Sequence, residues 1–591
     1  MKKYLFVLLT VAFIKQSFSQ QQTKWHEPQF VEGICVRDPG NIFHRLPIEM
    51  KDSVRKPVWD LSENTAGEFI HFKTSATEIK VRYTLSSKNF AMPHMPATGE
   101  SGVDLFAIDV NGNWNWTPGS YHFGDTCVYT FKNLFLARNG TGVSDFYLYL
   151  PLYNSVKWLS IGVSEKDSFS FPAKRKEKPI VAYGTSILQG GVASRPGLGW
   201  TNILGRNLDR TVINLGFSGN GRYEGPIFDL MAKLDAQLYI LDCMPNLTKG
   251  YSKEEIKKRL VYGANALRER NKNVPILFAE HADGYAPFYM DTARLNEFHG
   301  SSVMIAQIFD EFKSEGVKNI YLLTEKEIGF DMNSTVDGVH PNDIGMLQYA
   351  VAYEQKIREI LNEPVGEIST EIPIEQYRDG YDWIDRHEKV IEDIEQNSPE
   401  NLIIGNSIIH FFGGTPEYNI SRGNDAWDKY LKPLKVQNAG FGWDRIENVL
   451  WRVYHGEFDD FNGKNIVLMI GTNNLSVRSS DAEIVEGLQF LINAIKERKP
   501  NTNLIMVGIL PRVKSEAHVA AINQKIKAMA SKNHVAYADF GKDFLIGNKI
   551  NRKLFVSDGL HPNADGYEVM GKDLSKLLSV KSAKVKSEKA K

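Results

Sequence analysis

The sequence predicts a multidomain protein in which an antiparallel β-sandwich is followed by two three-layer α/β domains with parallel sheets. Residues 25–171 show short alternating segments separated by turns, whereas residues 177–362 show apolar runs that alternate with helical patterns. Residues 378–579 repeat that second pattern. A chain of 591 residues is also too long for one hydrophobic core.

The β-sandwich prediction depends on alternation of apolar and polar residues. Residues 78–85 and 147–150 alternate in this way, and turn pairs such as Asn111-Gly112 and Asn139-Gly140 separate the segments. Alternation with a period of two is typical of strands that are half buried in antiparallel sheets. No long amphipathic helix pattern interrupts this region.

The first α/β domain is predicted from buried strands that alternate with helices. It follows a basic segment bounded by Pro172 and Pro179. Continuous apolar runs separated by helices are typical of parallel sheets that are covered on both faces. The expected strands are 180–183, 238–241, 276–278 and 320–323, and the expected helices are 254–270, 293–315 and 343–361.

The second α/β domain follows an acidic, proline-containing linker at 363–377. The same order of strands and helices indicates a second copy of one architecture. The expected strands are 402–404, 464–470, 504–507 and 535–537, and the expected helices are 481–498, 515–532 and 564–578.

The two ends of the chain are predicted to lie outside these domains. Lys2 and Lys3 precede a short apolar stretch, and Ser17 and Ser19 form a small-x-small site, which together predict a signal peptide at 1–19. About ten apolar residues cannot cross a bilayer. No cysteine lies near the cleavage site, which argues against lipid attachment. We therefore expect a periplasmic or secreted protein with no membrane span and a solvated Lys-rich tail at 580–591.

Charge and cysteine content exclude several functions. With 70 Lys plus Arg against 71 Asp plus Glu, the formal charge is -1, so nucleic acid is not an expected partner. Three cysteines are too few for a disulfide framework or a cysteine-rich zinc site. A bridge between Cys35 and Cys127 stays open. No phosphate-binding glycine loop is present, and we expect no metal and no cofactor.

The first candidate nucleophile is Ser186, in the segment 183–187 that directly follows a buried strand. Open α/β sheets bind their ligands at the carboxyl ends of their strands. Asp337 and His340 follow three residues apart, a spacing at which a carboxylate can orient the imidazole that takes a serine proton. A turn serine alone would be uninformative, so the prediction depends on these partners.

The duplication supports the same interpretation. Ser407 follows the first strand of the second copy, and Asp558 and His561 follow near its end. Serine and histidine are 154 residues apart in both copies. Two pairs with one spacing are more than chance turn chemistry would give.

At these residues the chain resembles the SGNH (GDSL-type) hydrolase superfamily, whose four sequence blocks carry Ser, Gly, Asn and His. In the first copy the matching residues are Ser186, Gly219, Asn246 and His340, with Asp337 three residues before the histidine. The resemblance implies a flavodoxin-like α/β fold and an oxyanion hole formed by the serine and glycine N–H groups and the asparagine side chain. Cys243 and Pro245 depart from the usual third block.

The second copy resembles the superfamily at Ser407, Asn473, Asp558 and His561. The stretch 438–452 also resembles intracellular platelet-activating-factor acetylhydrolases. Trp443 stands where the block-two glycine is expected, so its N–H or that of Gly442 is implied as the second oxyanion donor. Residues 102–106 resemble the signature of a β module that precedes some bacterial SGNH esterases.

These features predict an exported serine esterase that removes short acyl groups, above all acetyl, from polysaccharides or oligosaccharides. The glycan substrate is inferred partly by analogy with the family. One alternative is a lysophospholipase or lipid acetylhydrolase, and another is a carbohydrate-binding protein in which one or both α/β domains are inactive.

Overall fold

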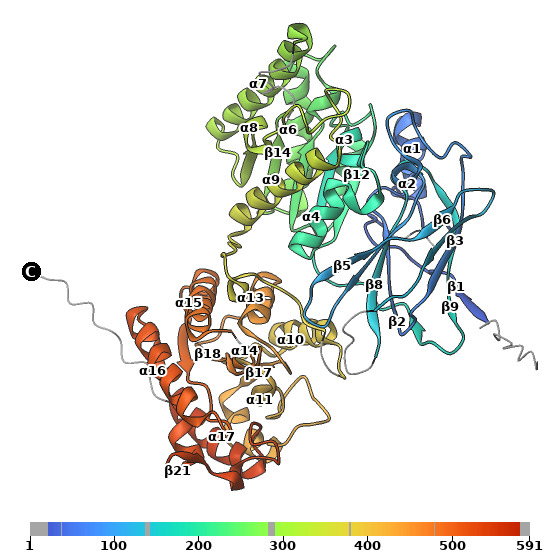
Figure 1. Cartoon of the computed structure of the whole chain (residues 1–591). Coiled ribbons are helices and arrows are strands. Elements are labelled where there is room, and N and C mark those ends of the chain that lie inside the picture. The colour runs from blue at the N-terminus through green and yellow to red at the C-terminus, as the bar shows by residue number, and fades with distance from the viewer. Residues whose placement is uncertain are drawn as a thin grey trace, which may run out of the picture.

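The computed structural model describes residues 22–36, 38, 40–135, 142–281, 290–377, 380–477 and 479–579. It contains an antiparallel β domain followed by two parallel-sheet α/β domains, which confirms the predicted fold class (Figure 1). The predicted signal peptide at 1–19 and the tail at 580–591 lie outside the described residues. Within the described ranges, we find no helix that combines the length and apolarity needed to cross a membrane.

The N-terminal domain is a sandwich of two five-stranded antiparallel sheets. The alternation predicted for 78–85 is seen in β3, where Ile79, Val81 and Tyr83 are buried between the sheets. In spatial order the first sheet contains β1 (Thr23–His26), β9 (Val156–Ser164), β3 (Ile79–Leu85), β7 (Cys127–Phe131) and β6 (Ser120–His122). The second contains β10 (Phe169–Ser170), β2 (Phe69–Thr74), β8 (Ser144–Tyr149), β4 (Asp104–Ile108) and β5 (Trp114–Thr117).

The sandwich domain shares hydrophobic cores with the first α/β domain. Its short helix α1 (Lys56–Ser62) places Trp59 in the core on one face of the parallel sheet. Met95, just before the short helix α2 (Ala97–Glu100), and Leu152 join the core on the opposite face. Because these contacts are apolar and buried, the loops of the sandwich domain are fixed relative to the α/β domain.

The first α/β domain has a parallel sheet whose first strand lies between the second and the third. Alternate residues of β11 enter two separate cores, Val181 and Tyr183 on one face and Ile180 and Ala182 on the other, which defines three layers. The strands in spatial order are β12 (Val212–Gly216), β11 (Ile180–Gly184), β13 (Leu238–Asp242), β14 (Ile276–Ala279) and β15 (Ile320–Leu323). The helices are α3 (Ser186–Gln189), α4 (Trp200–Leu208), α5 (Gly225–Met231), α6 (Lys253–Arg270), α7 (Thr292–Ser314), α8 (Glu325–Ile328) and α9 (Asp343–Leu361).

The second α/β domain has the same strand order. Ile403 of β16 enters one core, and Leu402 and Ile404 enter the other. The strands in spatial order are β17 (Val436–Gly440), β16 (Asn401–Gly405), β18 (Asn465–Met469), β19 (Asn503–Val507) and β20 (Ala536–Ala538). The helices are α10 (Trp383–Asn397), α11 (Ser407–His410), α12 (Asn424–Tyr430), α13 (Ile446–Tyr454), α14 (Thr472–Ser476), α15 (Asp481–Arg498), α16 (Glu516–Lys532) and α17 (Ala564–Ser579); β21 (Leu545–Ile546) and β22 (Lys549–Ile550) form a small hairpin.

Strands β12 and β17 were not among the predicted strands, because each carries a buried asparagine at its centre. The amide of Asn214 donates to the carbonyl of Leu188 and to the hydroxyl of Thr201. Asn438 in β17 donates to backbone carbonyls in the same way. These hydrogen bonds offset the cost of burying an amide. The asparagines nevertheless interrupt the apolar run from which a strand is predicted.

The disulfide that the sequence left open is not formed. Cys35 and Cys127 are both free and buried. Cys127, on β7, lies in the core of the sandwich, whereas Cys35 packs into the core of the first α/β domain. The two thiols therefore belong to different parts of the interior.

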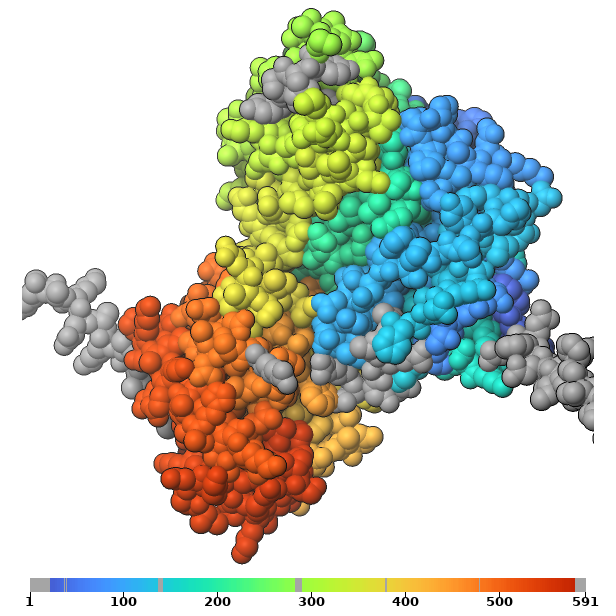
Figure 2. Space-filling model, in the orientation of Figure 1, coloured from blue at the N-terminus to red at the C-terminus, as the bar shows by residue number. Residues whose placement is uncertain are grey.

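The predicted linker at 363–377 is packed between the domains. Glu363 is 1% exposed and accepts hydrogen bonds from both terminal nitrogens of Arg210, at 2.6 and 2.9 Å. Arg210 also donates to the carbonyl of Tyr454 in the second α/β domain. In Figure 2 the second α/β domain lies below the other two and contacts both. The charge of Glu363 is thus paired in a buried interface between the two α/β domains.

Candidate active sites

Strand β11 ends at Gly184 and delivers Ser186 to the carboxyl edge of the first parallel sheet. Thr185 caps helix α3, and its hydroxyl accepts a hydrogen bond from the N–H of Ile187. A Cβ at Gly184 would lie 2.7 Å from the carbonyl oxygen of Asp242, so a side chain does not fit there. Since β11 lies between β12 and β13, Ser186 lies at the point where the strand order reverses, the usual ligand position in open α/β sheets.

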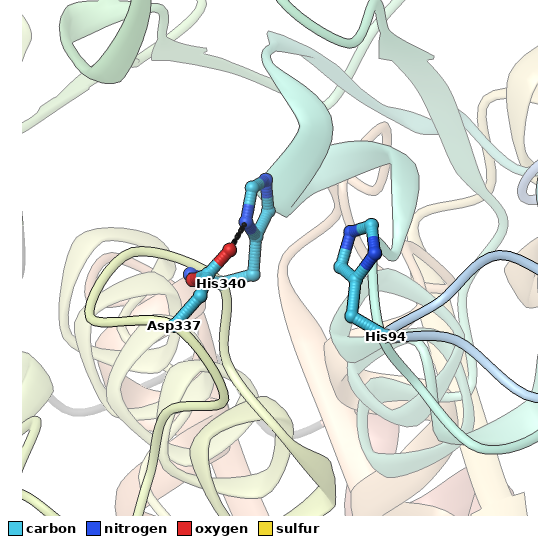
Figure 3. Close-up of side chains that lie close together, drawn as sticks. All are labelled: His94, Asp337 and His340. Atoms are coloured by element: carbon cyan, nitrogen blue, oxygen red, sulfur yellow. Dashed lines mark hydrogen bonds and ion pairs between the residues drawn. The ribbon is translucent and has the colours of Figure 1, made fainter.

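Ser186, His340 and Asp337 form a chain of hydrogen bonds. The Oγ of Ser186 lies 2.9 Å from Nε2 of His340, and Nδ1 of His340 lies 2.8 Å from Oδ2 of Asp337. Figure 3 shows the second of these bonds. The other oxygen of Asp337 accepts the backbone N–H of His340, which fixes the turn. The sequence-predicted residues of the first triad are therefore brought together in hydrogen-bonding geometry.

The carboxyl group of Asp337 is held in its ionised form. Partial burial favours the neutral acid, but hydrogen bonds from the side chain and backbone of His340 outweigh it and hold the pKa of Asp337 well below its usual range. An ionised carboxylate at Nδ1 leaves Nε2 as the nitrogen that can accept the proton of Ser186.

The loop after β12 carries Gly219, one of the expected oxyanion donors. Gly219 has φ +68, and a Cβ there would meet nothing within 4 Å. The preceding residue, Ser218, donates its N–H to Oε1 of Gln189. Asn246 accepts the N–H of Gly221 at 3.1 Å through Oδ1, which leaves its amide N–H groups for another acceptor. The role of Gly219 and Asn246 as oxyanion donors stays a prediction.

The second copy repeats the hydrogen-bond chain. The Oγ of Ser407 lies 2.8 Å from Nε2 of His561, and Nδ1 of His561 lies 2.7 Å from Oδ2 of Asp558. The backbone N–H of His561 donates to Asp558 at 3.0 Å. Burial again opposes ionisation, and the bonds from His561 lower the pKa of Asp558. Both copies therefore hold the same three groups in the same connectivity.

Trp443 takes the backbone conformation of Gly219. Its φ is +65, a left-handed value that is costly for a residue with a side chain. The N–H of Gly442, the other expected donor, is already bonded to Nδ1 of His410 at 3.0 Å. This bond corresponds to the one between Ser218 and Gln189, since His410 and Gln189 each lie three residues after the serine. Of the two expected donors, Trp443 is the one whose N–H corresponds to that of Gly219.

Two side chains from the segment before α10 hold the peptide that carries the Trp443 N–H. Gln376 and the hydroxyl of Tyr381 both donate to the carbonyl oxygen of Gly442, at 2.8 and 3.0 Å. The carbonyl of Gly442 and the N–H of Trp443 belong to one planar peptide unit. Fixing the oxygen therefore fixes the direction of the N–H.

We expect Trp443→Gly to widen the range of acyl groups accepted at the second site. Trp443 is 41% exposed on the loop after β17, so removal of its indole frees space there, while glycine adopts the same φ without a steric cost. The measurement is the ratio of octanoyl to acetyl ester hydrolysis in a chain that also carries Ser186→Ala.

Trp443→Ala is the matched control for Trp443→Gly. Both remove the indole, but only alanine keeps the left-handed strain, so the glycine variant should be more stable in urea by about 1 kcal/mol. An unchanged octanoyl to acetyl ratio in both variants would show that the indole does not limit the acyl group.

The two asparagines of the third block occupy equivalent positions. Asn246 and Asn473 each lie four residues after the last residue of their strand, β13 and β18. The two amides are oriented differently, because Nδ2 of Asn473 donates to the carbonyl of Asp444 at 3.0 Å. An amide nitrogen carries two hydrogens, so one remains for a substrate oxygen.

The loops after β12 and β17 are each supported by a buried arginine that was not among the predicted site residues. Arg45, 1% exposed, donates to the carbonyls of Asn214 and Gly216 at the end of β12. Arg386, 5% exposed, donates to the carbonyl of Gly440 at the end of β17. No local signal marks these residues, since one precedes its sheet by more than a hundred residues and the other lies on α10.

The surroundings of the two imidazoles differ. The ring of His94 lies 5.9 Å from that of His340, whereas the ring of Phe411 lies 5.2 Å from that of His561. His94, Asp337 and His340 are of the types that bind divalent metals, but both nitrogens of His340 are already hydrogen-bonded to Ser186 and Asp337. A metal ion there would have to break that chain.

Asp242, the last residue of β13, is predicted to make stability depend on pH. It is 2% exposed, and burial raises its pKa to about 7, although the hydroxyl of Tyr353 donates to it. Its unfolded value is about 3.9, so the folded chain keeps a proton that the unfolded chain loses. This contribution to stability is complete below about pH 4 and is lost as the pH rises toward 7.

Asp242→Asn should therefore raise the thermal unfolding midpoint more at pH 8 than at pH 5, because the amide removes the cost of burying a carboxylate. Asp235→Asn, at an exposed position, is the control and should show no such difference. Equal shifts at both pH values for Asp242→Asn would contradict the assignment.

Comparison with known proteins agrees with this architecture. Two models described as "GDSL-like Lipase/Acylhydrolase family" match residues 177–358 and 403–569, and one described as "N-terminus of Esterase_SGNH_hydro-type" matches residues 21–169. Platelet-activating factor acetylhydrolase IB subunit alpha2 of Rattus norvegicus is 27% identical over 201 residues, 33% of this chain and 83% of that protein. The IB subunit beta homolog of Drosophila melanogaster is 30% identical over 149 residues, 25% and 61% of the two chains.

A solved structure from Bacteroides ovatus, described as a GDSL-like lipase, is 29% identical with a TM-score of 0.51; the match covers 58% of this chain and 98% of that one. Fold, site and comparisons together define a carboxylic ester hydrolase. The chain belongs to the GDSL-like lipase/acylhydrolase (SGNH) family, with two such domains in tandem behind an esterase-type N-terminal module.

Proposed function

We propose that the chain is an exported serine esterase that removes short acyl groups, above all acetyl, from carbohydrate esters at two sites. The observation that carries the proposal is the hydrogen-bonded chain from serine through histidine to aspartate in both copies. Each copy also offers a backbone N–H from a residue in the left-handed conformation, Gly219 or Trp443, and an asparagine amide. These are the donor types that stabilise a tetrahedral intermediate.

In this mechanism Nε2 of His340 takes the proton of Ser186 as Oγ attacks the ester carbonyl. The N–H of Gly219 and the amide of Asn246 stabilise the negative oxygen. The protonated imidazole then gives its proton to the departing alcohol, which leaves an acyl-serine. Water, deprotonated by the same imidazole, attacks the acyl-serine and releases the carboxylic acid and the free serine. The second copy uses Ser407, His561 and Asp558 in the same roles, with Trp443 and Asn473 as donors.

The predicted signal peptide at 1–19 and the esterase-type sandwich domain support a polymer or oligosaccharide substrate outside the cytoplasm. Short acyl groups are supported at the second site by Trp443, whose large side chain stands where the first copy has Gly219. No metal or organic cofactor takes part in this mechanism.

The test is acetate release from acetylated xylan and other acetylated polysaccharides by the wild type, Ser186→Ala, Ser407→Ala and the double variant. We expect release by the wild type and none by the double variant. Hydrolysis of lysophospholipid without acetate release from any glycan would overturn the carbohydrate assignment.

A lipid acetylhydrolase is the second candidate, favoured by one specific observation. Phe411 faces His561, and Tyr418 stacks on Phe411 with ring centroids 5.7 Å apart, so the second site has an aromatic wall. The acetylhydrolase relatives support the same candidate. A carbohydrate-binding protein without catalysis is less supported, because the Ser–His–Asp hydrogen bonds are present in both copies. A serine-reactive phosphonate that labels neither Ser186 nor Ser407 would favour it.

A further inference from the structure

His94 lies on a loop of the sandwich domain that is anchored at both sides. Met92 and Met95 pair through two backbone hydrogen bonds, at 3.0 and 3.1 Å, and place Pro93 and His94 at the tip of a tight turn. Met95 is 1% exposed and packs in the core of the first α/β domain. The position of His94 is therefore set by the fold, although the side chain itself is exposed.

The imidazole of His94 faces the first triad. Figure 3 shows its ring beside that of His340, with Asp337 on the other side. The ring centroids are 5.9 Å apart. One nitrogen of His94, one nitrogen of His340 and one carboxylate oxygen of Asp337 all lie within 4.8 Å of one another. The two rings therefore border the same space beside the triad, where a polar group of a substrate can reach His94.

In ester hydrolysis the oxygen beside the catalytic imidazole is that of the departing alcohol, since this imidazole gives it a proton. We propose that His94 is a substrate-contacting residue of the first site, where it binds the alcohol half of the ester and selects polyhydroxylated alcohols such as sugars. This inference rests on the proposed function of Ser186. An imidazole can donate to one hydroxyl and accept from another, which suits a sugar ring and does not suit an alkyl chain.

The second site lacks this residue type at the corresponding place. The ring near His561 is that of Phe411, four residues after Ser407, whereas the ring near His340 is that of His94. The residue four after Ser186 is Gly190, which has no side chain and lies against Leu152 of the sandwich domain. The sandwich domain thus supplies a polar wall to the first site, whereas the second site builds an apolar wall from its own helix.

The test compares His94→Ala with His94→Gln in a chain that carries Ser407→Ala, so that only the first site works. Two acetyl esters are used, an acetylated xylo-oligosaccharide and 4-nitrophenyl acetate, whose leaving group has no neighbouring hydroxyls. We expect His94→Ala to lower kcat/KM at least about tenfold for the sugar ester, which corresponds to about 1.4 kcal/mol, and less than about threefold for 4-nitrophenyl acetate. His94→Gln should recover part of the loss, because it keeps a donor and an acceptor.

The control is His94→Ala in a chain that carries Ser186→Ala, where second-site activity should not change. Equal losses for both esters, a loss at the second site, or no loss at all would overturn the role of His94. Phosphonate labelling separates this result from the proposed function. If Ser186 is unlabelled while His94 is intact, the nucleophile assignment fails; if labelling is normal and the sugar preference is unchanged, only the role of His94 fails.

Discussion

Ser186→Ala, made in a chain that already carries Ser407→Ala, should abolish ester hydrolysis, with a loss of about 10⁴- to 10⁶-fold in kcat. The Oγ of Ser186 lies 2.9 Å from the imidazole that would take its proton, so this hydroxyl is placed to form the acyl bond. Removing one member of such a unit costs nearly as much as removing the whole unit. The measurement is acetate release, together with labelling by a serine-reactive phosphonate.

The two single serine variants serve as each other's control. Ser186→Ala alone should leave labelling at Ser407, and Ser407→Ala should leave labelling at Ser186. Both serines are 7% exposed and lie just after strand ends, so alanine should leave the free energy of unfolding within about 0.5 kcal/mol of that of the parent. Full turnover by the double variant would end both nucleophile assignments.

Asn246→Ala and Asn473→Ala should each lower kcat at their own site by about 10²- to 10³-fold, with a much smaller change in KM. The reason is that the amide meets a full negative charge only in the transition state. In the first site Oδ1 of Asn246 is fixed by the N–H of Gly221, so the amide nitrogen is directed away from that bond. In the second site one hydrogen of Asn473 is used by Asp444, so only the other contributes.

Each asparagine variant is measured in the chain whose other site carries serine to alanine, and the opposite site is the control. A fall in kcat/KM that comes entirely from KM would show that the amide binds substrate without stabilising the transition state. Equal loss at both sites would indicate damage to the fold.

Much of both sites could be predicted because the signals are local. Each serine directly follows a buried strand, and each aspartate lies three residues before its histidine, so spacing alone identified Ser186, His340, Ser407 and His561. The carboxyl ends of parallel strands meet at one edge, which is why residues 154 apart come within hydrogen-bonding distance. The strand and helix periodicities were clear where the strands are wholly apolar.

The remainder could not be predicted because it depends on contacts between distant segments. Arg45 donates to the end of β12, and the ring of His94 lies beside that of His340, but nothing in the sequence around either residue marks it as part of a site. Trp443 illustrates a different limit. Its type suggested a departure from the family pattern, but only its φ of +65 shows that the backbone keeps the conformation of a glycine.

The origin of the two supporting arginines has a consequence for how such chains are assembled in evolution. Arg386 lies on α10, inside the second domain, so a copy that begins at Gln376 carries both Arg386 and the glutamine that holds the Gly442 carbonyl. Arg45 belongs to the sandwich domain, so the first α/β domain can be inherited in this form only together with the module that precedes it. The two halves of the duplication are therefore unequal as building blocks: one is portable, and the other is bound to its neighbour.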